Sequence, residues 1–125
     1  MKTTRPVFLT VWRIRLPIPA LVSILHRISG IIIFLSLPLF LYWLSQSLVS
    51  ADHFDRLATQ LHTPGLKWVL WIVLSAVAYH FFAGVRHLLM DAGLAETLPA
   101  GRKSAGLVLI VTAIAVILLG IWLWL

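Results

Sequence analysis

Residues 21–49 read LVSILHRISGIIIFLSLPLFLYWLSQSLV, an apolar run that is long enough to cross a lipid bilayer as one helix. A transmembrane helix needs about 20 apolar residues to cross a hydrocarbon core of ~30 Å. Two further runs, 66–90 and 104–125, meet the same requirement. We therefore predict an all-α integral membrane protein, a single domain over 1–125, with three transmembrane helices in an up-down-up bundle.

The composition supports a membrane location. Hydrophobic residues make up 61% of the 125 residues, and the mean hydropathy is +1.00, which is too apolar for a water-soluble fold of this size. The chain has no cysteine, which excludes disulfides, thiolate-bound iron–sulfur clusters and cysteine zinc sites within it. The net charge of +6 comes from residues that flank the apolar runs, so we attribute it to topology and lipid headgroups and expect no nucleic-acid partner.

The distribution of basic residues predicts the orientation. They gather before the first span and in the second connection, which places the N-terminus and that connection in the cytoplasm. Indole rings favour membrane interfaces, and the predicted outer ends of the spans carry Trp43, Trp68, Trp71, Trp122 and Trp124. Both connections should be short loops: the outer one, 50–65, carries the turn signal Pro64-Gly65, and the inner one carries Pro99. Pro38 should kink the first span.

The N-terminal segment, 1–20, differs from the spans. Its arginines and prolines interrupt every apolar run before Ala20, so it resembles neither a signal peptide nor a membrane span. We expect this segment to lie along the cytoplasmic interface or to dock on a soluble partner.

A first polar cluster stands at the cytoplasmic start of the first span. Ser23, His26, Arg27 and Gly30 have offsets of 0, 3, 4 and 7, which fall on one face of a helix. A hydroxyl, an imidazole and a guanidinium beside a glycine gap suit a carbonyl-bearing or anionic cofactor. The alternative, equally weighted on spacing, is that Arg27 reaches lipid phosphates and His26 is an interfacial anchor.

A second polar cluster lies in AYHFFAGVRHLLMD, residues 78–91. His80 falls near the membrane midplane, and His80, Gly84 and His87 share one helix face. This order fits a haem along the helix, with His80 on the iron, Gly84 beside the porphyrin edge and either Arg86 or His87 near the propionates. An intramembrane histidine is more often a hydrogen-bonded packing residue or a proton relay, so spacing alone leaves both readings open.

The histidine positions set a further condition. A haem with two histidine ligands needs a second imidazole at the depth of His80. His26 and His87 lie nearer the cytoplasmic end, and His53 and His62 lie in the outer connection. If His80 binds haem, the other ligand must come from another subunit or another copy.

Taken together, these motifs resemble the cytochrome b anchor subunits of bacterial succinate dehydrogenase, the respiratory complex II. The resemblance rests on Arg5-Pro6, SILHRISG at 23–30, AYHFFAGVRHLLMD at 78–91 and AGRKSA at 100–105, and it covers nearly the whole chain. It implies a multi-pass subunit of the bacterial cytoplasmic (inner) membrane that has a flavoprotein, an iron–sulfur protein and a second small anchor as partners.

The resemblance also implies roles for individual residues. His80 would be one axial ligand of haem b, and the smaller anchor subunit would supply the other. Ser23 and Arg27 would contact ubiquinone, with Arg27 also near a haem propionate, and His26 and His87 would lie near the propionates. The chain would hold no succinate site and no catalytic residue of its own, and it would contribute part of the quinone-reduction site.

Three other functions remain open. An anchor of a fumarate reductase would have the same architecture and run electrons in the opposite direction. A small proton-relay or ion-relay subunit would use His80 and Arg86 without haem, and it would need an acidic residue in a span, for which Asp91 is the only candidate. A purely structural anchor would bind no cofactor and would tolerate replacement of His80 by leucine.

Overall fold

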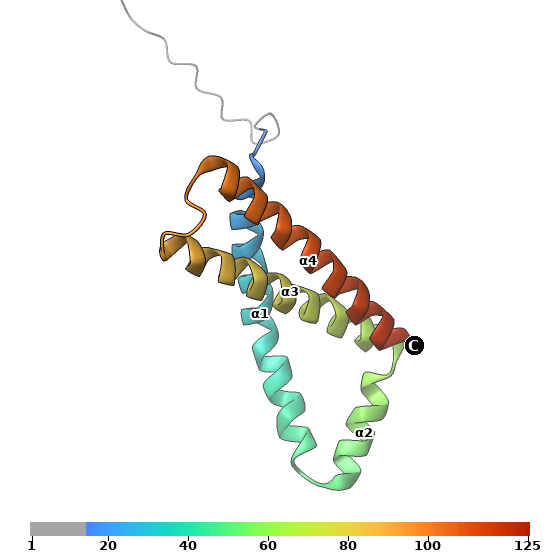
Figure 1. The fold of residues 1–125 in the computed structure, drawn as a ribbon. Helices are drawn as coiled ribbons and strands as arrows, with labels where there is room; N and C mark the ends of the chain where they lie inside the picture. Colours follow the sequence, from blue (N-terminus) through green and yellow to red (C-terminus); the bar gives the residue numbers. More distant parts are fainter. Residues whose placement is uncertain (1–14) are drawn as a thin grey trace, which may run out of the picture.

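The computed structural model describes residues 15–125, which fold into four α-helices (Figure 1). They are α1 (Ile18–Ser47), α2 (Ala51–Leu61), α3 (Pro64–Asp91) and α4 (Leu98–Trp124). Three of them, α1, α3 and α4, are long and apolar enough to cross a membrane. The predicted all-helical class with three candidate spans is confirmed, while the up-down-up topology and the cytoplasmic N-terminus stay predictions.

Proline marks the beginning of each long helix. Pro19, Pro64 and Pro99 lie at the first or second helical position of α1, α3 and α4, where a missing backbone N–H costs nothing because that group has no partner inside the helix. The expectation that Pro64-Gly65 and Pro99 lie in loops was therefore wrong. Pro38 lies inside α1, which continues through it to Ser47.

The connection between α1 and α3, which was expected to be a plain loop, contains the helix α2. The Ser50 hydroxyl caps this helix by accepting a hydrogen bond from the backbone N–H of His53 at 3.2 Å. Asp52 lies in the first turn, where a negative charge is favourable, and pairs with Arg56 one turn later at 2.8 Å. These local interactions explain why a polar stretch between two spans is helical.

The N-terminal prediction is only partly covered by the structure. Residues 1–14, with Arg5-Pro6 and most of the predicted interfacial segment, lie outside the described residues. At the other end of that segment, α1 already begins at Ile18.

The three long helices converge near the N-terminal half of α1 (Figure 1). The core there consists of Val22, Tyr79, Ala83, Ala105 and Val108. Ala83 and Ala105 are fully buried, as expected where small residues allow helices in membranes to approach closely. The Tyr79 hydroxyl donates a hydrogen bond to the Val22 carbonyl at 2.8 Å and so joins α3 to α1.

Helices α3 and α4 pack side by side in opposite directions. The Trp71 indole N–H donates to the Val116 carbonyl at 3.0 Å, and the Arg86 guanidinium donates to the Gly101 carbonyl at 3.3 Å. The later half of α1 leads away from this pair toward α2 (Figure 1), and its apolar side chains, such as Phe34 and Leu35, face outward.

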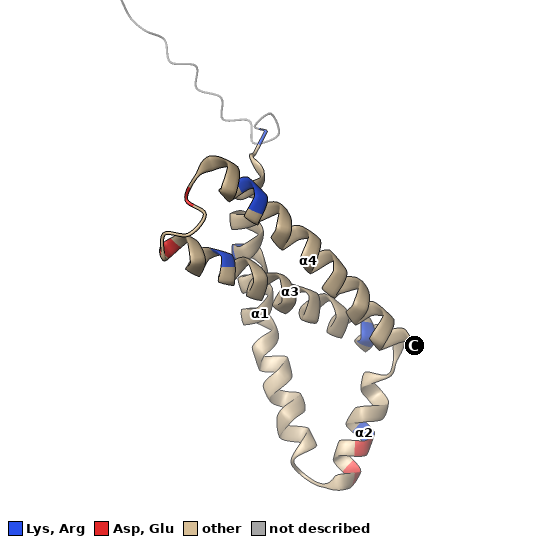
Figure 2. Cartoon of the chain, viewed as in Figure 1, with Lys and Arg blue, Asp and Glu red and all other residues tan. Residues whose placement is uncertain are grey.

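Charged residues lie toward the ends of the long helices, whose middle stretches are nearly free of them (Figure 2). Arg102 and Lys103 are exposed in the first turns of α4. This distribution is typical of helices whose middle parts lie in hydrocarbon, because a charge there is costly.

Replacing Ala83 by leucine tests the packing of the core. Ala83 has 0% exposure, so the added carbons must displace neighbouring helices, at a cost of about 1–3 kcal/mol. We expect Ala83→Leu to lower the thermal unfolding midpoint of the detergent-solubilised protein, measured by circular dichroism. Val85→Leu is the matched control, since Val85 is 39% exposed on the same helix. Equal midpoints for the two variants would contradict the packing described.

Candidate functional site

Three histidines from two helices meet in one cluster. The imidazoles of His26 in α1 and His80 in α3 are stacked, with ring centroids 4.1 Å apart and planes inclined by 13°. The ring of His87, two turns after His80, meets His26 edge-on with centroids 4.9 Å apart. The two polar clusters predicted from the sequence are therefore parts of a single site.

Counting along the first span placed His26 nearer the cytoplasmic end than His80. In the structure, the crossing of α1 over α3 brings the His26 ring against the rings of both His80 and His87, and the depth of these residues in a membrane stays a prediction. The stacked rings of His26 and His80 are in contact, with no space between them for a metal. Axial ligands must point their nitrogens at a metal from opposite sides, and rings that lie face to face at 4.1 Å leave no room for a porphyrin between them.

The Nδ1 atom of His80 lies against two oxygens of α1. It is 3.1 Å from the His26 carbonyl oxygen and 3.0 Å from the Ser29 hydroxyl oxygen. A carbonyl can only accept, so Nδ1 carries the proton and donates it. Among residues 15–125, Nε2 has no hydrogen-bond partner. This imidazole thus holds its second nitrogen free as a lone-pair donor, which is the arrangement usual for histidines that bind metals.

Two glycines admit the rings between the helices. A Cβ atom on Gly30 would lie 3.1 Å from Cε1 of His80, and one on Gly84 would lie 3.4 Å from Nε2 of His26. Each of the two helices thus has a glycine beside the imidazole of the other helix. The space beside Gly84 that the sequence analysis assigned to a porphyrin edge holds the His26 ring in this structure, and that assignment stays a prediction.

Ser23 and Arg27 lie on α1 at the edge of this cluster. Ser23 is half-buried and Arg27 is exposed. Neither side chain forms a hydrogen bond or ion pair with another residue of the described part of the chain. Contact of these two side chains with a quinone stays a prediction.

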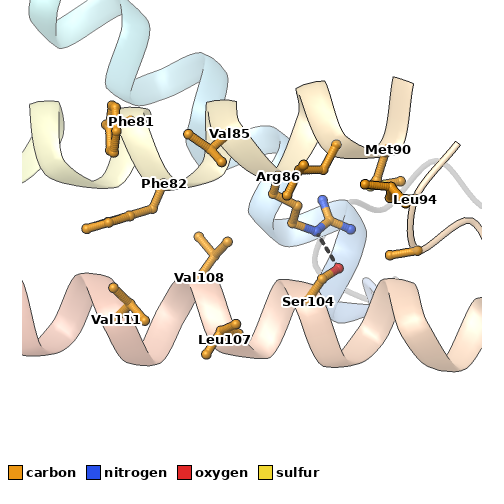
Figure 3. A pocket seen from close by; sticks show the side chains of 12 residues that line it. Phe81, Phe82, Val85, Arg86, Met90, Leu94, Ser104, Leu107, Val108 and Val111 are labelled. Carbon is orange, nitrogen blue, oxygen red and sulfur yellow. Dashed lines mark hydrogen bonds between the residues drawn. The ribbon is translucent and has the colours of Figure 1, made fainter. Parts of the chain in front are cut away.

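Arg86 belongs to another face of α3. It is only 5% exposed, and its Nε donates to the Ser104 hydroxyl at 3.0 Å, so it joins α3 to α4 (Figure 3). It also borders a cavity of about 410 Å³ with otherwise mostly apolar walls. Of the two residues considered for the propionate end of a haem, the structure brings His87, and not Arg86, to the histidine cluster.

Sequence reasoning missed Ser29 and Tyr79 as members of this region. Ser29 is 5% exposed and contacts His80, and Tyr79 joins the two helices one residue before His80. Ser29 lies within the SILHRISG motif three residues after His26, so its helical spacing could have indicated it.

No metal site is complete within the described residues. Over 15–125, no group of three or more histidine, cysteine, aspartate or glutamate side chains is arranged to hold a metal ion. A metal at His80 would therefore need ligands from a cofactor or from another chain.

Comparison with known proteins identifies the family. Residues 1–119 match the family model described as succinate dehydrogenase/fumarate reductase transmembrane subunit. The chain is 45% identical, over 99% of its length and 100% of the relative, to the succinate dehydrogenase cytochrome b556 subunit of Coxiella burnetii.

Two more distant relatives agree with this match. The succinate dehydrogenase cytochrome b556 subunit of Paracoccus denitrificans is 31% identical over 73% of this chain and 70% of the relative. The mitochondrial inner membrane protein SHH3 of Saccharomyces cerevisiae is 32% identical over 70% of this chain and 47% of the relative. The resemblance predicted from the two polar motifs is confirmed, and the chain belongs to the succinate dehydrogenase/fumarate reductase transmembrane subunit family.

Proposed function

We propose that this chain is a membrane-anchor subunit of a bacterial succinate dehydrogenase, in which it shares a haem b with a second anchor subunit and forms part of the ubiquinone-reduction site. Family membership supports the role of anchor. The two cytochrome b556 relatives are named for succinate dehydrogenase and for a b-type cytochrome, which favours this enzyme over a fumarate reductase. The observation that carries the haem assignment is the His80 imidazole, whose Nδ1 faces two α1 oxygens and whose Nε2 has no hydrogen-bond partner within residues 15–125.

The side chains of the histidine cluster are of the types that bind haem, an imidazole for the iron and nitrogen donors for the propionates. His80 would be the ligand that this chain gives to the iron. His26, His87 and Arg27 supply nitrogen donors for the propionates, two of them within the cluster and one exposed beside it. When bound, haem b supplies a centre that takes up and releases one electron at a time.

A second small anchor is the proposed source of the opposite axial ligand. His26 is the only histidine of residues 15–125 that stacks on His80, and its ring lies parallel to that of His80 instead of facing it across a gap. The apolar outer face of α1, including Ile24, Ile28 and Ile31, is exposed in the isolated chain. This face is suited to pack against another transmembrane helix.

Ser23 and Arg27 are the proposed quinone-binding residues. Reduction of a quinone to a quinol takes two electrons and two protons, and negative charge develops on the carbonyl oxygens. A hydroxyl and a guanidinium donate hydrogen bonds that orient these oxygens and stabilise this charge. Their exposure fits a site that is completed by other subunits. His26, one turn from Ser23, is a candidate for holding a proton near these oxygens.

Family membership supports further partner subunits. The sequence has no cysteine for a thiolate-bound iron–sulfur cluster, and the described residues consist of four helices, three of which could cross a membrane. A flavoprotein would oxidise succinate, and an iron–sulfur protein would pass the electrons to the membrane. We place the complex in the bacterial cytoplasmic membrane. The relative from Coxiella burnetii supports a bacterial origin of the chain.

A proton-relay subunit without haem is less well supported. Such a relay needs an acidic residue within a span, and Asp91 is exposed at the last residue of α3. Arg86, the other polar residue of this hypothesis, faces α4 and forms no contact with the histidine cluster in the described structure.

His80→Leu tests the haem assignment. We expect the purified complex to lose or shift the b-type band in its reduced-minus-oxidised optical spectrum, with succinate and with dithionite as reductants, because leucine has no lone pair for iron. His62→Leu is the control, since His62 is exposed after α2. A wild-type spectrum in the His80→Leu complex would rule out this ligand and favour a structural anchor.

Gly30→Ala tests the space that admits the His80 ring. A Cβ 3.1 Å from Cε1 of His80 forces the ring to shift, so we expect less haem per assembled complex, measured by the pyridine haemochrome assay. Gly106→Ala makes the same substitution in α4, where nothing lies within 4 Å of the new Cβ, and should keep full haem content. Equal haem in both variants would contradict the fit described here.

Arg27→Gln tests the quinone assignment. Loss of a charge-assisted hydrogen bond, worth about 1.5–3 kcal/mol, should lower kcat/KM for ubiquinone by roughly tenfold to a hundredfold, while succinate oxidation with a soluble dye as acceptor is unchanged. Arg102→Gln removes an exposed cation at the start of α4 and serves as the control. If both variants reduce quinone at the wild-type rate, Arg27 does not bind quinone.

A further inference from the structure

Ser29 forms the polar link between the two helices at His80. Its side chain is buried, with 5% exposure. The hydroxyl donates a hydrogen bond to the His26 carbonyl oxygen at 2.7 Å and lies 3.0 Å from Nδ1 of His80. That Nδ1 atom is also 3.1 Å from the same carbonyl oxygen. Three polar atoms thus form a closed triangle at the contact between α1 and α3.

One assignment satisfies all three contacts of this triangle, with His80 protonated on Nδ1. The carbonyl oxygen of His26 can only accept, and it then receives both the Ser29 hydroxyl hydrogen and the Nδ1 hydrogen of His80. With its own hydrogen directed to the carbonyl, the Ser29 oxygen is the second acceptor of the one Nδ1 hydrogen, which the two oxygens share. Ser29 therefore favours the Nδ1-protonated form of His80 and fixes the rotation of its ring.

Other serines of α1 show which part of this arrangement is special. Ser36, Ser45 and Ser47 also donate to the carbonyl three residues earlier, each at 2.7 Å. This local bond is ordinary helix behaviour. Among these four serines, Ser29 alone reaches a side chain of another helix in the described structure.

We propose that Ser29 is a positioning residue for the metal-binding histidine, one that selects the tautomer of His80 and tunes the electron density of its Nε2. This inference rests on the proposed haem ligation by His80. A hydrogen bond accepted from Nδ1–H makes an imidazole a stronger donor to its metal. A stronger donor stabilises the oxidised iron, so the Ser29 hydroxyl lowers the haem reduction potential.

The test is a redox titration of the haem in the purified four-subunit complex, followed optically, in wild type, Ser29→Ala, Ser29→Thr and Ser36→Ala. We expect Ser29→Ala to raise the midpoint potential, because Nδ1 loses one of its two acceptors. Ser29→Thr keeps a hydroxyl that can bond the same carbonyl and should return the potential toward the wild-type value. Ser36→Ala removes a matched local bond and should leave the potential unchanged.

Each outcome bears on one proposal. A Ser29→Ala complex with full haem and the wild-type potential would overturn the role of Ser29 while leaving haem ligation intact, and so would an equal shift in Ser36→Ala. A wild-type complex without haem would overturn the proposed function itself. If Ser29→Ala does not retain haem, the potential is measured in Ser29→Cys, where a weaker acceptor of similar size should shift it upward; no shift there would also overturn the inference.

Discussion

The close crossing of α1 over α3 at the histidine cluster is the constraint on which the rest of the site depends. A Cβ on Gly30 would crowd the His80 ring at 3.1 Å, and one on Gly84 would touch the His26 ring at 3.4 Å, about the limit of ordinary contact. The rings that enter this space are polar, and hydrocarbon offers them no hydrogen-bond partners. The His26 carbonyl and the Ser29 hydroxyl are hydrogen-bond partners of His80. The contact between α1 and α3 therefore both packs the helices and provides the polar partners of this histidine.

One face of α3 carries the histidines, and another face packs against α4. His80 and His87 face α1, whereas Arg86 faces α4 and joins the two helices through Ser104 and Gly101. The Trp71–Val116 bond joins α3 to α4 near the other end of the pair. Helix α4 thus supports the helix that carries His80 without contributing a residue to the histidine cluster, as expected when packing outside a site holds its side chains in place.

Much of the fold was predictable because membrane spans are encoded by local composition. The three apolar runs correspond to α1, α3 and α4, since length and hydropathy suffice to indicate a span. Helix α2 was missed because the outer connection has no such run, and its Ser50 cap and Asp52–Arg56 pair are weak local signals. Pro64 was assigned to a turn because proline fits a turn and a first helical position equally well.

Residue spacing predicted which residues of the site share a face within each helix. Spacing identified His26 and Gly30 on one face of the first span, and His80, Gly84 and His87 on one face of the second. It could not indicate how the two faces meet, because the level at which helices cross depends on packing of the whole bundle. For this reason the stacking of His26 on His80 and the contact of Ser29 with Nδ1 became visible only in three dimensions.

We propose that His80 binds the haem iron through Nε2 and that the second ligand comes from another chain. The most direct measurement is a cryo-electron microscopy map of the assembled complex with its haem. Our account predicts continuous density from Nε2 of His80 to the iron, an imidazole of a second anchor subunit on the other side, and Nδ1 of His80 still against Ser29. An iron without any ligand from this chain, or one bound through Nδ1 of His80, would contradict it.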